Sequence, residues 1–211
     1  MYIAIEGVIG VGKTTLARLL QLLFEAELLL EVFEENPFLS AFYTDRARYA
    51  FQTQIFFLLS RYHQQRRAVP QILAAGKNLI SDYTFAKDAL FARINLSGDE
   101  LEMYYRVHEA LAEKIPRPDL IVYLRASTDV LMQRIALRDR PYERNMEREY
   151  IDLLNRAYEE FFAHPYDDTP VLTIDTNALN FVLYPEHLQH IEQRIRQTLN
   201  LLPYQPSLPL S

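Results

Sequence analysis

Short apolar runs alternate along the chain with segments in which apolar residues recur at helical spacing. The runs are apolar on both faces, which is typical of parallel strands covered by helices on each side. They predict strands at residues 2–6, 28–33, 78–82, 120–125 and 171–175. The helical spacing predicts helices near residues 13–25, 45–67, 85–96, 99–114, 128–138, 147–163 and 186–200. This alternation indicates an α/β fold, a doubly wound five-stranded parallel sheet with helices on both faces.

The length of 211 residues suits one domain, and we expect that domain to cover residues 1–202. Residues 203–211 contain three prolines and are predicted to form an extended tail. No apolar run approaches the roughly 20 residues that span a bilayer, and the first predicted strand starts at residue 2, which leaves no room for a signal peptide. We therefore expect a cytoplasmic protein without a membrane partner.

Composition narrows the chemistry further. The chain has no cysteine, which excludes disulfides, thiolate zinc sites and cysteine nucleophiles and fits a cytoplasmic location. Its formal net charge of −6 argues against a nucleic-acid partner. A local basic patch remains compatible with phosphate binding.

The first predicted strand is followed by a phosphate-binding motif. Residues 7–14 read G-x-x-x-x-G-K-T, and three of the chain's five glycines lie in this loop. A strand before the motif and a helix after it are the context that a P-loop requires. Glycines let backbone N–H groups turn toward phosphate oxygens, and the helix N-terminus favours an anion. The residues expected to bind ATP are Gly7, Val8, Ile9, Gly10, Val11, Gly12, Lys13, Thr14 and Thr15.

Three side chains are predicted to complete the phosphate site. Lys13 reaches the β- and γ-phosphates as a point charge, and Thr14 offers its hydroxyl to Mg²⁺. Asp82 ends the third predicted strand, where a parallel sheet delivers an acid beside the P-loop, so it is expected to hold Mg²⁺ directly or through water. A simple strand-end cap is the alternative for Asp82.

An arginine cluster follows the fourth predicted strand. Arg134 and Arg138 are four residues apart and share a helix face, and Arg140 follows just beyond. Planar guanidinium groups suit the oxygens of a phosphoryl group in transfer, so this cluster is predicted to be a catalytic lid. The alternative is a solvated basic face balanced by Asp139 and Glu143.

The P-loop is shared by switches, motors and kinases. A guanine-reading Asn-Lys-x-Asp stretch is absent, and the chain is short for an AAA-type motor. The small α/β domain with an arginine-rich lid indicates a nucleoside or nucleotide kinase.

Beyond the P-loop, several segments resemble the deoxynucleoside kinase family, especially its bacterial deoxyadenosine/deoxyguanosine kinases. The more selective ones are Glu-Asn-Pro-Phe-Leu at 35–39 and Phe-Gln-Thr-Gln at 51–54, continuing to Ser-Arg at 60–61; Ser-Asp-Tyr-Thr-Phe-Ala-Lys-Asp at 81–88 and Arg-Ile-Ala-Leu-Arg-Asp-Arg at 134–140 also match. The matches run in order through about residue 175. The resemblance implies a P-loop nucleotide-kinase fold, a deoxynucleoside substrate, and ATP with Mg²⁺.

The resemblance also implies an acceptor-binding residue set. It implies that Glu31 takes or orients the proton of the 5′-hydroxyl, with Glu34 and Glu35 as competitors for this role. A carboxylate is a sensible partner for a hydroxyl that attacks a phosphoryl group in line. Tyr43 and Glu143 match residues that contact the 3′-hydroxyl.

The base site is implied in the same way. Gln54 matches a glutamine that hydrogen-bonds the base edge, and Arg61 matches an arginine that pairs with an aspartate, here Asp88. An acid near the base favours an exocyclic amino group over a thymine carbonyl, so deoxyadenosine, deoxyguanosine or deoxycytidine is expected. Three aromatic residues are candidates to flank the base or to pack in the core: Tyr49, Phe57 and Phe91.

One position departs from the family pattern. Many family members have an arginine directly after the acid, where this chain has Tyr83. The departure leaves more of the work at the 5′-end to Lys13 and the lid arginines. It also disfavours a nucleoside monophosphate kinase, the alternative with the same fold. A non-catalytic nucleotide-binding subunit is the alternative from another class.

By resemblance, the protein is expected to be a homodimer that pairs through the 45–67 and 99–114 helices.

Overall fold

The computed structural model describes residues 1–164 and 169–203. Within this part of the chain, five parallel strands form one sheet in the order β2-β3-β1-β4-β5. The strands are β1 (Tyr2–Gly7), β2 (Ala26–Leu29), β3 (Asn78–Ser81), β4 (Leu120–Arg125) and β5 (Val171–Asp175). The predicted α/β fold with a five-stranded parallel sheet is confirmed. The last residues of the predicted tail, 204–211, lie outside the described residues.

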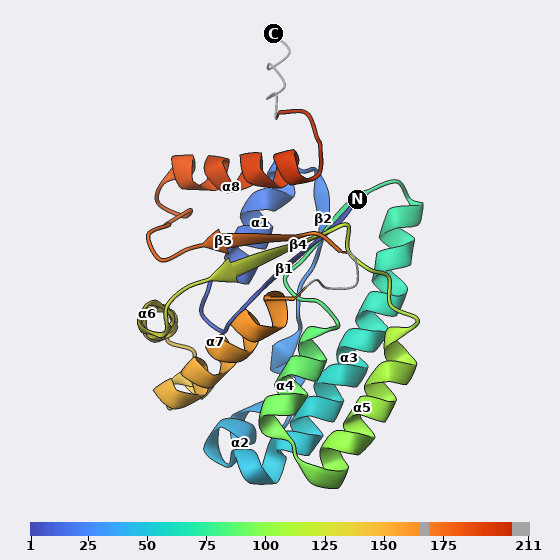
Figure 1. Cartoon of the computed structure of the whole chain (residues 1–211), viewed down its shortest axis with the longest axis vertical. Helices are drawn as coiled ribbons and strands as arrows, with labels where there is room; N and C mark the ends of the chain where they lie inside the picture. The colour runs from blue at the N-terminus through green and yellow to red at the C-terminus, as the bar shows by residue number, and fades with distance from the viewer. Residues whose placement is uncertain (165–168, 204–211) are drawn as a thin grey trace.

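Helices cover both faces of the sheet. Figure 1 shows α1 (Lys13–Leu23) and α8 (Pro185–Thr198) above the strands. Below them lie α4 (Lys87–Asn95), α5 (Gly98–Ala112) and α7 (Arg148–Phe162), while the long helix α3 (Arg46–Ala74) runs along the right-hand side, past the level of the strands. The central strands β1 and β4 are almost wholly buried, as strands covered on both faces should be.

Shorter elements gather near the end of the sheet to which the strand arrowheads point. Helix α6 (Thr128–Arg138) lies beyond the arrowhead of β4. Helix α2 (Leu39–Thr44) and the 3₁₀ turn η2 (Pro141–Glu143) contact each other. A further 3₁₀ turn, η1 (Phe33–Glu35), follows β2. These elements surround the carboxyl ends of the strands, where open α/β sheets bind ligands.

The second strand differs from its prediction. It was expected at 28–33, but the last residue paired with β3 is Leu29, opposite Ser81. The N–H of Glu31 donates instead to the side chain of Asp82 at 2.8 Å, and Phe33 begins η1. The apolar run continues past Leu29, but a side-chain acceptor directly after the neighbouring strand β3 replaces the backbone acceptor that a longer ladder would use.

Helix α3 runs further than expected. It was predicted to end near residue 67, yet it continues to Ala74 with Pro70 inside it. Proline lacks the N–H that would bond to residue 66, so the helix loses one hydrogen bond without ending. Its N-terminus is capped by Asp45, whose carboxylate accepts from the N–H of Arg48 at 3.3 Å.

One carboxylate lies inside the sheet. Glu6 of β1 is 1% exposed. It accepts hydrogen bonds from the N–H and hydroxyl of Thr84, at 2.6 and 2.8 Å, and from the hydroxyl of Tyr158 at 3.1 Å. A buried charge is tolerated when it is fully hydrogen-bonded. Glu6 thereby fixes the loop that follows β3, directly beside the phosphate loop.

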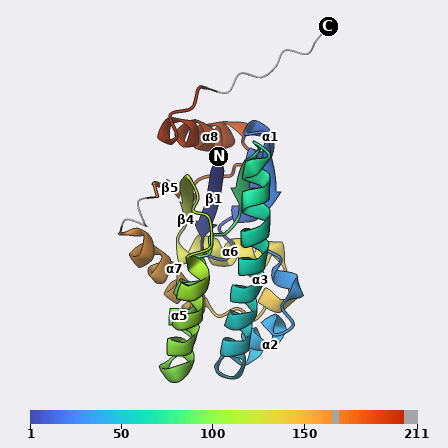
Figure 2. The same ribbon diagram turned by 90° about the vertical axis from the view of Figure 1, so that its right-hand side faces the viewer.

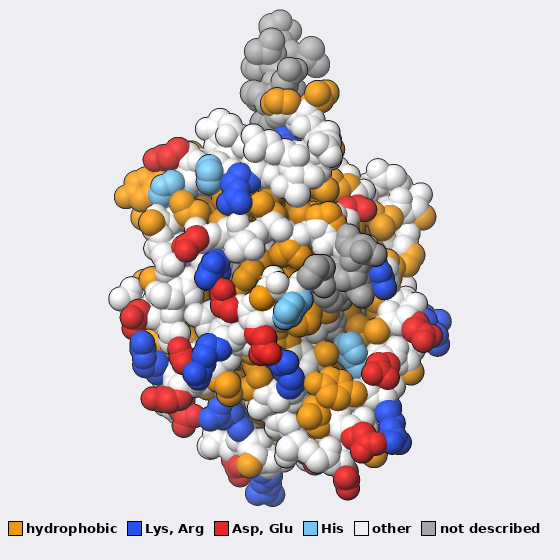
Figure 3. All heavy atoms as spheres, in the orientation of Figure 1, with side chains coloured by type: hydrophobic (Ala, Val, Ile, Leu, Met, Phe, Trp, Pro, Cys, Tyr) orange, Lys and Arg blue, Asp and Glu red, His pale blue; other side chains and the backbone are white. Residues whose placement is uncertain are grey.

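No helix in the described ranges is long and apolar enough to cross a membrane. On the face shown in Figure 3, basic and acidic side chains are interspersed over the lower half of the molecule.

Candidate active site

The loop between β1 and α1 has a backbone shape that requires glycine. Gly7 has a φ of 143° and Gly12 a φ of 105°, which L side chains rarely adopt. A Cβ on Gly7 would lie 2.3 Å from the carbonyl oxygen of Leu124 on the neighbouring strand. The loop leads directly into the N-terminus of α1, where free N–H groups and the helix dipole favour an anion.

Lys13 is the first residue of α1 and closes the loop. Its Nζ donates to the carbonyl oxygen of Gly7 at 2.7 Å and to that of Val8 at 3.2 Å. Burial, followed by the positive charge of Lys87, lowers the pKa of Lys13 to about 8. An ammonium group held in this way is stabilised when an anion such as a phosphate enters the loop.

Thr14 and Asp82 bring together the two side-chain oxygens that are expected to bind Mg²⁺. The hydroxyl of Thr14 donates to the carboxylate of Asp82, whose other oxygen accepts from the N–H of Glu31. Mg²⁺ prefers hard oxygen ligands and usually takes one or two from the protein, with water and substrate phosphates completing its shell. The residues present therefore fit a magnesium ion bound together with the phosphates.

Glu31 is held by two cations. Its Oε1 accepts from Nε of Arg61 at 2.9 Å, and its Oε2 accepts from Nζ of Lys87 at 2.7 Å. Burial by itself raises the pKa of Glu31, but the charges of Arg61 and Lys87 outweigh it and hold that pKa well below its usual range. The carboxylate is ionised and its two oxygens are fixed in direction.

Arg61 also forms an ion pair with Asp88, as the resemblance implied. Asp88 is fully buried and is not among the residues that line the neighbouring cleft. Its expected influence on the base stays a prediction. The structure places Asp88 behind Arg61, where it orients the guanidinium.

A single cleft brings most of the predicted site residues together. The predicted residues in its lining are Ile9, Gly10, Lys13, Thr14, Glu31, Tyr43, Gln54, Arg61, Asp82, Arg138, Arg140 and Glu143. Phe57 and Phe91 also line the cleft, whereas Tyr49 is not among its lining residues. The phosphate loop is therefore continuous with a space bounded by carboxylates, an amide and aromatic rings.

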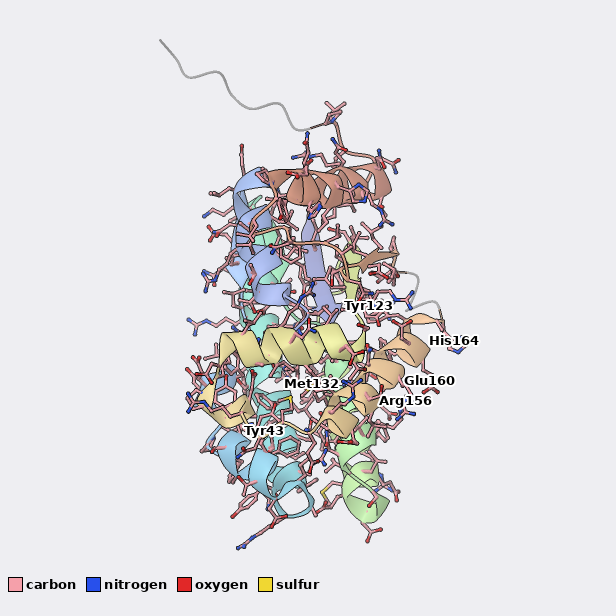
Figure 4. All side chains as sticks on the ribbon, turned by 90° about the vertical axis from the view of Figure 1, so that its left-hand side faces the viewer. Tyr43, Tyr123, Met132, Arg156, Glu160 and His164 are labelled. Atoms are coloured by element: carbon pink, nitrogen blue, oxygen red, sulfur yellow. The ribbon has the colours of Figure 1, made fainter. Side chains whose placement is uncertain are left out.

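Aromatic rings form one wall of this cleft. Tyr43 lies on α2, below α6 in the view of Figure 4. Its ring stacks on that of Tyr142, with centroids 6.4 Å apart and an interplanar angle of 12°. Burial, followed by the neighbouring Tyr150 and Glu143, raises the pKa of Tyr43 well above its usual value, so its hydroxyl remains a hydrogen-bond donor.

The lid arginines Arg138 and Arg140 converge on Glu143. Arg138 donates to Oε2 of Glu143 from Nε at 3.1 Å and from Nη2 at 2.5 Å. Arg140 lies 3.6 Å from the other carboxylate oxygen. Glu143 is only 4% exposed, so both guanidinium groups are drawn to the cleft wall.

Arg134 is not among the residues that line this cleft. Its guanidinium donates to the hydroxyl and carbonyl of Thr176, at 3.0 and 2.6 Å, and to the carbonyl of Val11 at 3.3 Å. It lines a second hollow, on the outer side of the phosphate loop, together with Phe181. These donors tie the phosphate loop to the segment after β5, and the action of Arg134 on the phosphoryl group stays a prediction.

Among the residues around the cleft and the phosphate loop that were not assigned a role from the sequence are Lys87, Tyr142 and Phe181. Lys87 lies inside the 81–88 segment that carries the resemblance, so the signal was present without an assignment. Phe181 packs against Gly12, whose Cβ would lie 3.0 Å from its ring. Its role depends on a contact across most of the chain, which no local pattern indicates.

Helix α3 connects the two strand ends that carry the acids. Gln64 donates from Nε2 to the carbonyl of Leu30 at 2.9 Å and accepts from the hydroxyl of Tyr83 at 2.5 Å. Gln54 and Arg61 lie on the same helix. One rigid element thus carries the predicted base-reading side chains and holds the loops of Glu31 and Asp82.

Known proteins provide an independent comparison. The sequence profile described as deoxynucleoside kinase matches residues 3–200. A deoxyguanosine kinase of Bacillus subtilis is 35% identical over 201 residues, covering 94% of this chain and 97% of the relative. A deoxyadenosine kinase of Dictyostelium discoideum is 36% identical over 179 residues, covering 82% of this chain and 71% of the relative.

Solved structures lead to the same family. A deoxyadenosine kinase from M. mycoides, with the products dCMP and a flexible dCDP bound, superposes with a TM-score of 0.82 at 28% identity, covering 93% of this chain and all of the other. The same enzyme with bound dATP gives a TM-score of 0.81 at 28% identity, covering 93% of this chain and 99% of the other. Because the profile match extends over nearly the whole chain and the phosphate loop opens into an acceptor cleft, the chain belongs to the deoxynucleoside kinase family and carries out ATP-dependent phosphorylation of a deoxynucleoside.

Proposed function

We propose that this kinase transfers the γ-phosphoryl group of ATP to the 5′-hydroxyl of a deoxynucleoside whose base is a purine or cytosine. The observation that carries the proposal is the placement of Glu31 and Lys13 in one cleft. A carboxylate that accepts a hydroxyl proton thereby faces the ammonium group that holds the donor's phosphates.

The donor end uses residues 7–15. Backbone groups of the loop and Lys13 bind the β- and γ-phosphates, while Thr14 and Asp82 hold Mg²⁺ with the nucleotide. The ion neutralises phosphate charge when it is bound. Arg134 supports this end indirectly, since it holds the phosphate loop against Thr176.

The acceptor end is centred on Glu31. Its two oxygens are fixed by Arg61 and Lys87, so a 5′-hydroxyl that replaces one of these donors meets a carboxylate already in its accepting state. Because the pKa of Glu31 lies well below its usual range, orientation of the hydroxyl precedes full proton transfer. Arg138 and Arg140 line the same cleft and stabilise charge on the phosphoryl group.

The base and sugar occupy the remainder of the cleft. Gln54 is 2% exposed and lines it, and its amide offers one donor and one acceptor direction to a base edge. Phe57 and Phe91 flank this space. Tyr43 and Glu143 line the same cleft; in this proposal they contact the 3′-hydroxyl, and their bulk crowds a 2′-hydroxyl.

Two alternatives make different predictions. A nucleoside monophosphate kinase needs an extra arginine for the acceptor's phosphate, and Tyr83 stands where that arginine would serve. A non-catalytic nucleotide-binding subunit has no need of the cations around Glu31. Both alternatives concern turnover, so one assay addresses them.

The decisive assay couples ADP release to ATP and Mg²⁺, with deoxyadenosine, deoxyguanosine, deoxycytidine, thymidine and their monophosphates in parallel. We expect turnover on a purine deoxynucleoside or deoxycytidine, with thymidine poor and the monophosphates inactive. Turnover on a monophosphate alone would contradict the acceptor assignment. ATP binding without turnover on any acceptor would favour the non-catalytic subunit.

We also propose a cytoplasmic homodimer paired through α3 and α5. These helices lie side by side in Figures 1 and 2 and contact each other. Leu59 of α3 and Met103 of α5 are exposed. Light scattering should give twice the mass of the 24.8 kDa chain, and Leu59→Glu should shift it toward the monomer while Leu137→Glu, on α6, does not.

A further inference from the structure

The residue directly after Asp82 contributes no charge to the cleft. Tyr83 is fully buried and packs with Tyr2, Leu29 and Val69. Its hydroxyl donates to Gln64 rather than to a group in the cleft. The side chain at this position therefore serves the packing of α3 on the sheet.

A cation reaches the same region from Lys87, the first residue of α4. Lys87 is 7% exposed and lines the cleft, with its Nζ 2.7 Å from Oε2 of Glu31. The ring of Phe91 lies 5.6 Å from the same nitrogen and limits its freedom to move outward. Burying an ammonium group is costly, so its presence beside the acceptor carboxylate calls for a function.

Lys87 also lies near the donor's phosphates. Its charge is the second cause, after burial, of the lowered pKa of Lys13. Two ammonium groups in one cleft repel each other, and this repulsion is relieved when anionic phosphate lies between them. Lys87 thus contacts the carboxylate that accepts the proton and lines the same cleft as Lys13 of the loop that presents the γ-phosphate.

We propose that Lys87 is a catalytic residue that contacts the phosphoryl group in transfer at the acceptor's 5′-end. In the reaction, the 5′-oxygen forms a bond to the γ-phosphorus, the bond to the bridging oxygen breaks, and that oxygen leaves with the electron pair as part of ADP. The hydroxyl proton passes to Glu31. As Glu31 is neutralised, its ion pair with Lys87 weakens, and the ammonium group turns its charge to the phosphoryl oxygens.

This inference rests on the proposed function, because it requires a 5′-hydroxyl as acceptor. It differs from a purely structural role in one measurable respect. A cation that acts on the transition state changes kcat, whereas one that only maintains the fold changes thermal stability and substrate binding together.

The test compares Lys87→Met, Lys87→Arg and the control Lys77→Met. Methionine keeps the aliphatic stem beside Phe91 and removes the charge. Lys77 pairs with Glu27 at the surface, with a side chain that is 58% exposed. The measurements are kcat and KM for both substrates, the Kd of ATP without acceptor, and the thermal midpoint.

We expect Lys87→Met to lower kcat by about 10²- to 10³-fold, the range for loss of one charge-stabilising donor. The Kd of ATP should change by less than about threefold and the KM of the deoxynucleoside by less than about tenfold, since the interaction belongs to the transition state. Lys87→Arg should restore kcat to within about tenfold of the wild type, because it retains the positive charge.

An unchanged kcat in Lys87→Met would overturn the proposal. If Lys87→Met does not fold, Lys87→Gln takes its place, and a wild-type kcat in that variant would overturn the proposal equally. Failure of the proposed function is distinguishable, since the wild-type enzyme would then turn over no deoxynucleoside in the same assay, and the assignment of Lys87 would fail with it.

Discussion

Arg61 joins two carboxylates, that of Glu31, two residues after β2, and that of the buried Asp88 on α4. A single guanidinium thereby couples the proposed acceptor carboxylate to an acid outside the cleft lining. Because Arg61 itself lines the cleft, the orientation of its guanidinium affects both the space for the acceptor and the carboxylate of Glu31.

Asp88→Asn should therefore impair the acceptor site without removing a residue from it. With the ion pair lost, Arg61 is held from one side only, and misplacement of a positioning group costs up to about 100-fold in rate. We expect kcat/KM for the deoxynucleoside to fall by about 10- to 100-fold, with the KM of ATP nearly unchanged. Asp99→Asn, in the exposed first turn of α5, is the matched control; equal effects in both variants would contradict the coupling.

Glu31→Gln tests the acceptor carboxylate directly. Loss of a positioned general base typically lowers the rate by about 10²- to 10⁴-fold, and kcat should fall within this range. Glu27→Gln removes an exposed carboxylate of β2 and should leave kcat unchanged. If Glu34→Gln or Glu35→Gln lowered kcat instead, the carboxylate that accepts the hydroxyl proton would be a residue of η1.

The acid side of the pH profile follows from the lowered pKa of Glu31. A carboxyl whose folded pKa is depressed contributes stability above its unfolded pKa of about 4.3, and that contribution is lost as the pH falls through the folded pKa. Glu31 thus stays ionised at mildly acidic pH. We expect no decline of kcat from protonation of Glu31 as the pH is lowered from 7 to 5. A decline of kcat in this range that disappears in Glu31→Gln would contradict this.

The sequence predicted the elements of the fold more completely than the contacts within the site. Strands β1, β3, β4 and β5 lie within one residue of their predicted bounds, because their sequences are apolar on both faces. The short helix α2 was missed: its six residues follow Pro37 and show no extended periodicity. The displaced end of β2 arises from Asp82, which accepts the N–H of Glu31 from 51 residues away in sequence.

The site shows the same division. Glycine, lysine and threonine in the phosphate loop follow from a local motif. The spacing of Arg134 and Arg138 on one helix face is also a local pattern. Their hydrogen-bond partners are not predicted by it: Arg134 donates to Thr176, and Arg138 donates to Glu143. Lys87 depends on a contact with Glu31, 56 residues away in sequence, that only the folded chain provides.

The lowered pKa of Lys13 predicts that the protein takes up protons when it binds ATP. In the nucleotide-free protein its pKa is about 8, and phosphate raises that pKa. ATP binding at pH 8.5 should therefore take up a fraction of a proton, and at pH 6.5 close to none. Calorimetry in buffers of different ionisation enthalpy measures this number.

The lowered pKa of Lys13 also makes the stability of the fold depend on pH. The folded pKa of Lys13 lies below its unfolded value of about 10.4, so its stability penalty is complete below pH 8 and is relieved as the pH rises through the folded pKa. Equal proton uptake at pH 6.5 and 8.5 would contradict the lowered pKa.

Gly12→Ala tests the contact between the phosphate loop and Phe181. The new Cβ would lie 3.0 Å from the ring, at a φ of 105°. Gly76→Ala is the matched control, since Gly76 also has a positive φ, of 72°, but has no atom near its Cβ position. Backbone strain should cost each variant about 1 kcal/mol of stability. Only Gly12→Ala should raise the KM of ATP, and an equal rise in both variants would show that strain alone matters.

Helix α3 limits how this enzyme's substrate range evolves. Gln54 lines the cleft where we propose that the base binds, while Arg61 and Gln64 on the same helix hold the loops of Glu31 and Asp82. A substitution that shifts the helix to admit a bulkier nucleoside analogue also displaces the catalytic carboxylates. Laboratory evolution toward such analogues should therefore select changes on the opposite wall, at Tyr43, Tyr142 and Phe91, and leave α3 intact.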